Sequence, residues 1–228
     1  MVTHHDPTTC AERVAIVTGG SRGVGREVVR QLSHRDFALV VGYARNRDAA
    51  DSVVGEVLAE GRTALTIRAD VADELDVERM FAETTKAFGG VDVVVHAAGR
   101  TIPGPVGGHD LDRFDLLQRT NVRSTFVVNR QAVRQLRDGG TIVNLSGAAV
   151  GPAVPTDAAS AASRGAVEAM TRALARELRG RDITVNAVAP GPTGRHRATA
   201  MARVVALLVS GDGRSLNGQV IQVDEGTT

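Results

Sequence analysis

Short apolar runs rich in β-branched residues alternate with longer segments of helical periodicity along almost the whole chain. The runs are expected strands, and they cover Arg13–Thr18, Ala38–Gly42, Ala64–Arg68, Val91–His96, Thr141–Ser146, Ile183–Val188 and Gln219–Val223. Several are almost continuously apolar, which is typical of parallel strands covered on both faces. The alternation predicts an α/β fold with one doubly wound parallel sheet of about seven strands and helices on both faces.

Two of the intervening segments carry apolar residues at helical spacing. One predicted buried helix face consists of Val167, Met170, Leu174 and Leu178, with Gly180 as the stop. The other consists of Phe114, Leu117, Val122, Phe126 and Val133. No linker or repeat interrupts the pattern, so we expect a flexible tail over residues 1–12 and a single domain over residues 13–228.

The composition excludes several classes of protein. With 27 basic and 26 acidic residues in 228, the net charge of +1 provides no global field for nucleic acid. Cys10 is the single cysteine, which excludes an internal disulfide and a thiolate metal cage. No apolar run approaches the roughly 20 residues that span a bilayer. We therefore expect a cytoplasmic protein without a metal, nucleic-acid or membrane partner.

A glycine-rich turn joins the first expected strand to the first helix. Its sequence, Thr18–Gly25, places glycines where a backbone must turn tightly and let a pyrophosphate approach the amide groups. This position between strand and helix predicts a dinucleotide-binding domain of Rossmann type. The expected cofactor contacts are Gly19, Ser21, Arg22, Gly23, Val24 and Gly25. The alternative is a glycine-rich turn without a ligand.

The end of the second strand indicates which dinucleotide binds. NAD-selective sites place a carboxylate there, but in this chain no carboxylate follows the strand until Asp48. Arg45, with Arg22 and Arg47, is available to hold a 2′-phosphate, and Tyr43 and Asn46 flank it. The sequence therefore predicts NADP(H) over NAD(H). The alternative is that these arginines are ordinary solvated surface charge.

Further motifs follow the later strands. They are Asp70–Val71, His96–Gly99, Thr120–Val122, Ile142–Ser146, Ile183–Pro192, Asn217–Gln219 and Val223–Gly226. With the glycine turn, this set resembles the short-chain dehydrogenase/reductase family over nearly all of Arg13–Gly226. The resemblance implies hydride transfer between a nicotinamide and a carbonyl or alcohol. It also implies cofactor contacts from Asp70, Val71, Ala97, Ala98, Gly99, Arg164, Pro190, Gly191 and Thr193.

The catalytic residues that the resemblance implies are only partly present. Asn121 matches the asparagine that supports a proton-relay water, and Ser146 matches the serine that orients the carbonyl. The family's proton-donating tyrosine falls on Ser160, and the lysine that lowers its pKa falls on Arg164. No other register supplies the missing pair, because Tyr43 is the only tyrosine and Lys86 the only lysine.

A second departure concerns the substrate lid. Only residues 194–200 separate Thr193 from a final helix expected near Met201, so the lid is truncated and the site open. Other groups that offer a proton are His109, His196 and Asp157. Each is also accounted for as an exposed loop residue.

Three functions remain open at this point. The first is an NADP(H)-dependent oxidoreductase with an atypical proton relay, in which Ser160 passes a proton from water, acting on a small carbonyl, quinone or alcohol. The second is a catalytically inactive nucleotide-binding protein that serves as a sensor or partner subunit. The third is an isomerase or lyase on the same scaffold. The resemblance also implies a homodimer or homotetramer.

Overall fold

The computed structural model describes residues 12–147, 158–191 and 197–224, and they form one sheet with helices on both faces. All neighbouring strands are parallel, in the order β3-β2-β1-β4-β5-β6-β7. The strands are β1 Arg13–Thr18, β2 Phe37–Tyr43, β3 Ala64–Arg68, β4 Val91–His96, β5 Leu136–Leu145, β6 Thr184–Pro190 and β7 Val220–Val223. The predicted seven-stranded α/β fold is confirmed.

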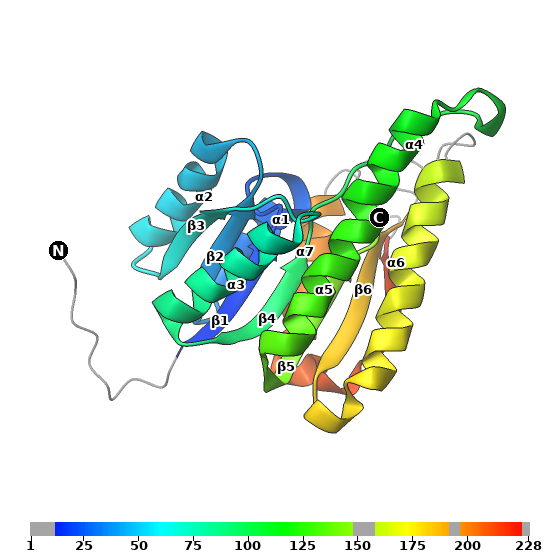
Figure 1. Cartoon of the computed structure of the whole chain (residues 1–228). Helices are drawn as coiled ribbons and strands as arrows, with labels where there is room; N and C mark the ends of the chain where they lie inside the picture. Colours follow the sequence, from blue (N-terminus) through cyan, green and yellow to red (C-terminus); the bar gives the residue numbers. More distant parts are fainter. Residues whose placement is uncertain (1–11, 148–157, 192–196, 225–228) are drawn as a thin grey trace.

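The helices cover the two faces in two sets. They are α1 Gly23–Ser33, α2 Arg47–Ala59, α3 Glu74–Phe88, α4 Leu111–Gln118, α5 Ser124–Gln135, α6 Ala158–Glu177 and α7 Arg197–Leu208. Because successive side chains of a strand point to opposite faces, Val17 packs with α1, α2 and α7 while Ile16 packs with α3 and α5. Figure 1 shows α3, α5 and α6 together on the near face of the sheet.

The strands were placed correctly, and only their ends differ from expectation. β1, β3 and β4 have the predicted bounds, whereas β5 starts at Leu136 rather than at Thr141. Leu136 pairs with Val91, and the register shifts between Val91 and Val93. This irregular start includes Gly139 and Gly140, which interrupt the apolar pattern, so the sequence did not indicate that the strand begins at Leu136.

The expected buried helix over Phe114–Val133 is wrong in its register. The chain forms α4, one π-helical turn over Arg119–Arg123 and then α5. A π turn contains an extra residue, so it rotates the following helix about its axis relative to a continuous α-helix. As a result Phe126 is 60% exposed and Val128 is fully buried, whereas Leu117, which precedes the π turn, is fully buried as predicted.

Three further sequence-based positions need correction. The buried residues of α6 are Ser160, Ser163, Val167, Thr171 and Ala175, while Met170 and Leu174 lie half-buried beside them. Helix α6 ends at Glu177, and Gly180 lies within a short 3-10 turn over Arg179–Arg181 instead of stopping the helix. Helix α7 starts at Arg197 rather than near Met201, so residues 197–200 of the expected lid belong to it.

Candidate functional site

The site lies where the order of the strands reverses. The chain builds β1, β2 and β3 outward and then returns to place β4 beside β1. Loops leaving the carboxyl ends of β1 and β4 therefore run in opposite directions and leave a crevice between them, where doubly wound sheets bind ligands. The glycine turn after β1 and the segment Ala97–Gly99 after β4 meet at this place.

The glycine turn is closely packed at two positions where no side chain fits. At Gly19, which has a φ of +66°, a Cβ would lie 2.9 Å from the backbone nitrogen of Ala98. At Gly25, a Cβ would lie 2.3 Å from the carbonyl oxygen of Gly19. Helix α1 begins at Gly23, and in the described structure the Arg22 side chain does not cap it. The first helix amides are thus oriented as an anion site requires, which fits a dinucleotide pyrophosphate.

The residues expected at the 2′-phosphate have unequal surroundings. Arg45 and Arg22 are exposed, and Arg47 forms an exposed ion pair with Asp51 at 3.2 Å. The Asn46 side chain accepts from the Ala49 amide and caps α2. Tyr43 is only 9% exposed and packs in the core beneath α1 and α2. Ser21 is half-buried and Val24 is buried, whereas Arg22, Arg45 and Arg47 are all exposed.

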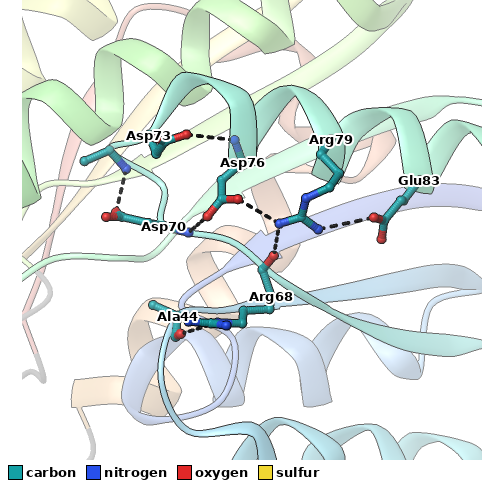
Figure 2. Close-up of polar contacts among 8 residues, drawn as sticks. Ala44, Arg68, Asp70, Asp73, Asp76, Arg79 and Glu83 are labelled. Carbon is teal, nitrogen blue, oxygen red and sulfur yellow. Dashed lines mark hydrogen bonds and ion pairs between the residues drawn. The ribbon is translucent and has the colours of Figure 1, made fainter.

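Asp70 and Val71 lie in the turn between β3 and α3, which a network of polar contacts holds (Figure 2). The Asp70 amide donates to Asp76 Oδ2 at 2.8 Å, and the Ala72 amide donates to Asp70 Oδ1 at 3.0 Å. Arg79 donates to Asp76 Oδ1 and to the Arg68 carbonyl. The hydrogen bond from Arg79 is the main cause that lowers the pKa of Asp76 below its ordinary value.

The ionisation of Asp70 reflects two opposing effects. Partial burial by itself raises the pKa of the Asp70 carboxyl, but the Ala72 amide and the Arg119 guanidinium more than offset this. The net result is a lowered pKa, so Asp70 is a carboxylate at neutral pH and can only accept hydrogen bonds. A fixed acceptor of this kind suits the exocyclic amine of adenine.

His96, at the end of β4, is almost completely buried and links three elements. Its Nδ1 lies 2.8 Å from Thr18 Oγ1 of β1, and its Nε2 lies 3.0 Å from Ser124 Oγ of α5. The Ser124 hydroxyl donates to the Thr120 carbonyl, so Ser124 Oγ must accept from Nε2–H and Nδ1 must accept from Thr18. Burial lowers the pKa of His96 to about 4, consistent with a neutral ring.

Asn121 lies in the π turn and is held by three hydrogen bonds. Its Oδ1 accepts from the Arg100 amide at 2.9 Å, and its Nδ2 donates to the Arg100 carbonyl and to Ser163 Oγ. Ser163 comes from α6, so Asn121 connects the loop after β4 to the helix that carries Ser160 and Arg164. A π turn at such a position is typical of functional sites.

The other expected catalytic residues do not all face one place. A pocket at this edge is lined by Ala98, Gly99, Asn121, Thr125, Leu145, Gly147, Ser163, Arg164 and Val167. Arg164 also packs over Gly147: a Cβ added to Gly147 would lie 2.8 Å from Cδ of Arg164. Ser160 does not line this pocket, because its buried hydroxyl accepts from the Ile102 amide at 3.3 Å. Ser146 is fully buried and donates to Glu168 Oε1 at 3.3 Å.

The remaining expected positions lie at the edges of the site. Pro190 is half-buried at the end of β6, and the Gly191 amide donates to the Val223 carbonyl at 2.8 Å. Thr193, Asp157 and His196 lie outside the described residues. Searched over the described ranges, the chain has no group of histidine, cysteine, aspartate or glutamate side chains that could hold a metal. In the same ranges no helix is long and apolar enough to cross a bilayer.

Four residues that were not predicted contact the expected site. Ser163 bonds Asn121, Glu168 bonds Ser146, and Arg119 and Arg123 contact the turn after β3. Ser163 is one residue before Arg164, and Glu168 is one helical turn after it. This helical spacing could have indicated that both residues lie near the site. Nothing in the local sequence signalled Arg119 or Arg123, because their partners are about 50 residues earlier.

Fold and site together define a Rossmann-type protein with a glycine turn of the dinucleotide-binding kind. A family model described as short chain dehydrogenase matches residues 13–205. The chain therefore belongs to the short-chain dehydrogenase/reductase family.

Named relatives and solved structures agree with this assignment. A short-chain type dehydrogenase/reductase of Picea abies is 34% identical over 94% of this chain and 92% of its own. A tetrahydroxynaphthalene reductase of Pyricularia oryzae is 33% identical over 94% of this chain and 89% of its own. A Burkholderia cenocepacia short chain dehydrogenase solved with NADP is 33% identical, with a TM-score of 0.83, over 93% of this chain and 96% of its own.

Proposed function

We propose that this protein is an NADP(H)-dependent oxidoreductase that interconverts a small carbonyl or quinone and the corresponding alcohol, with an atypical proton relay. The observation that carries the proposal is the convergence of the glycine turn, Asn121 and Arg164 around one crevice at the carboxyl edge of the sheet. The cofactor supplies the hydride when bound, and the protein binds it, orients the substrate and manages the proton.

The preference for NADP(H) rests on charge at the end of β2. Arg45 and Arg22 are exposed, and no carboxylate stands between the end of β2 and Asp48 to select a free ribose hydroxyl. The Burkholderia cenocepacia relative was solved with NADP. Calorimetric titration with NADPH and NADH tests this preference, with Arg47→Ala as the matched control for Arg45→Ala because Arg47 is paired with Asp51. A preference for NADPH that Arg45→Ala removes and Arg47→Ala keeps is expected, and equal binding of both nucleotides contradicts it.

The proton relay is proposed to run through Ser146 instead of Ser160. Ser146 lies between Leu145 and Gly147, which line the pocket. In the oxidation direction Ser146 Oγ takes the proton of the substrate hydroxyl as its own proton passes to Glu168 Oε1, the acceptor of its hydrogen bond, and in the reduction direction both transfers reverse. Glu168 is 27% exposed, which leaves it open to protons from water. Arg164 would hold the nicotinamide ribose, and Asn121 would hold a water beside it. This arrangement favours a substrate whose hydroxyl is already acidic, since an aliphatic serine is a weak acid.

The substrate class follows from that chemistry. A quinone or a polyhydroxylated aromatic ketone needs little help from a strong protein acid. One relative is named a tetrahydroxynaphthalene reductase, and its name describes a substrate of this kind. The experiment is NADPH oxidation with a panel of quinones and polyhydroxylated aromatic ketones. Glu168→Gln should lower turnover by about 10²-fold or more, the usual effect of losing a positioned acid. Glu177→Gln, on the same helix and exposed, is the control and should have no effect.

A catalytically inactive nucleotide-binding protein remains the second candidate, and the surroundings of Ser160 favour it. Ser160 accepts from the Ile102 amide at 3.3 Å and does not line the pocket, so it is poorly placed to replace a tyrosine. Tyr43 is buried in the core, and Lys86 is exposed on α3. If no substrate of the panel oxidises NADPH but the Ser160→Tyr, Arg164→Lys double variant does, the natural chain is the inactive form.

The other expectations stay predictions. They are the tail over residues 1–12, the truncated lid near 194–200, the homodimer or homotetramer and the cytoplasmic location.

A further inference from the structure

Two arginines of the π turn reach across to the turn that carries Asp70. Arg119 Nη2 donates to Asp70 Oδ2 at 2.9 Å, and Arg123 Nε donates to the Ala72 carbonyl at 2.9 Å. The first contact pairs the ionised Asp70 carboxylate with a guanidinium, and the second holds the backbone two residues later. We call this pair of contacts the arginine clamp.

The clamp depends on the same π turn that positions Asn121. Arg119 and Arg123 are the first and last residues of that turn, and both contact the segment Asp70–Ala72. Asn121, midway between them, instead contacts Arg100 and Ser163. One turn of helix is therefore attached to the segment after β3 on one side and to the pocket beside Arg164 on the other.

The clamp contributes little to folding. Arg119 and Asp70 are 49% and 47% exposed, and ion pairs this exposed contribute about 0–1 kcal/mol to stability. The turn is moreover already held from its other side, because the Asp70 amide donates to Asp76 and Arg79 bonds the Arg68 carbonyl (Figure 2). The Ala72 amide already binds Oδ1 of Asp70, and Arg119 adds a second restraint on the direction of the carboxylate by binding Oδ2, while Arg123 holds the carbonyl of Ala72.

We infer that Arg119 and Arg123 are positioning residues that set the selectivity of this site for adenine. The inference rests on the proposed function, since it assumes that the cofactor's adenine lies against Asp70 and Val71. Asp70 Oδ1 accepts from Ala72 and Oδ2 from Arg119, and each carboxylate oxygen keeps a second lone pair. A carboxylate oriented in this way accepts from the exocyclic amine of adenine and repels the carbonyl oxygen that hypoxanthine has there.

The experiment compares the affinities of NADPH and its hypoxanthine analogue, deamino-NADPH, by calorimetry. The wild type should prefer NADPH by about tenfold or more, as expected for a hydrogen bond to a charged group. Arg119→Gln and Arg123→Gln should each reduce that preference severalfold. Arg119→Lys should retain part of it, because the charge remains while the planar fork is lost. Arg130→Gln is the matched control, since Arg130 pairs with Glu74 of α3, outside the clamped segment.

Each outcome separates the inference from the proposed function. If the wild type binds neither nucleotide, the proposed function fails and the inference fails with it. If the wild type binds both nucleotides equally, or the glutamine variants keep the full preference, only the inference is overturned. An equal loss in Arg130→Gln also overturns it, because the effect would then follow from helix packing. Thermal unfolding of every variant identifies a folding defect, and Arg123→Gln decides the question if Arg119→Gln fails to fold.

Discussion

The buried His96 should make the stability of this protein depend on pH in a range where most proteins are stable. Its ring is neutral in the folded state, because burial lowers the pKa of His96 from 6.5 to about 4. Between those values the unfolded chain binds a proton that the folded chain does not. The free energy of unfolding must therefore fall as the pH falls through this window.

The size of the effect follows from the two pKa values. Lowering the pKa of His96 from 6.5 to about 4 corresponds to roughly 3 kcal/mol in the free energy of unfolding, since each pKa unit is worth about 1.4 kcal/mol. About 2 kcal/mol of this should be lost between about pH 7 and about pH 5. That amount is a large fraction of the total stability of an ordinary domain, about 5–15 kcal/mol.

Urea unfolding of the wild type and of His96→Asn at several pH values measures this contribution. Asparagine can both donate and accept, so it can keep part of the contact with Thr18 and Ser124 without titrating. His34→Asn is the matched control, because His34 is 64% exposed at the end of α1. The wild type and His34→Asn should lose about 2 kcal/mol more than His96→Asn between about pH 7 and about pH 5. Equal losses in all three proteins would refute the reasoning.

Three other predictions concern the crevice. Gly25→Ala should abolish NADPH binding in calorimetry, because its Cβ would lie 2.3 Å from the Gly19 carbonyl oxygen and force the turn open; unchanged affinity contradicts the packing argument. Asn121→Ala removes three hydrogen bonds and should cost about 1–3 kcal/mol in urea unfolding. Asp76→Asn should weaken NADPH binding through the Asp70 turn yet change the free energy of unfolding by less than about 1 kcal/mol, because the Asp76 side chain is 38% exposed.

The sequence by itself determined the features that depend only on residues close together in the chain, namely the strands and the glycine turn. Near-continuous apolar runs such as Val91–Val95 identify strands buried on both faces, because period and branching act within a few residues. The glycine turn was equally readable, since close backbone packing at Gly19 and Gly25 excludes every other residue. The order of strands and motifs along the chain predicted that Asn121 and Arg164 lie near each other, and both line one pocket.

The tertiary structure decided everything that depends on which distant residues meet. The π turn places Phe126 on the surface, because an inserted residue rotates a helix without changing its composition. Burial between β1 and α5 makes His96 a neutral link, although the same residue at a surface would titrate near its ordinary pKa. Ser146 faces Glu168, and Arg119 faces Asp70, across sequence gaps of 22 and 49 residues. Contacts of this kind arise from the packing of whole elements, which no short stretch of sequence encodes.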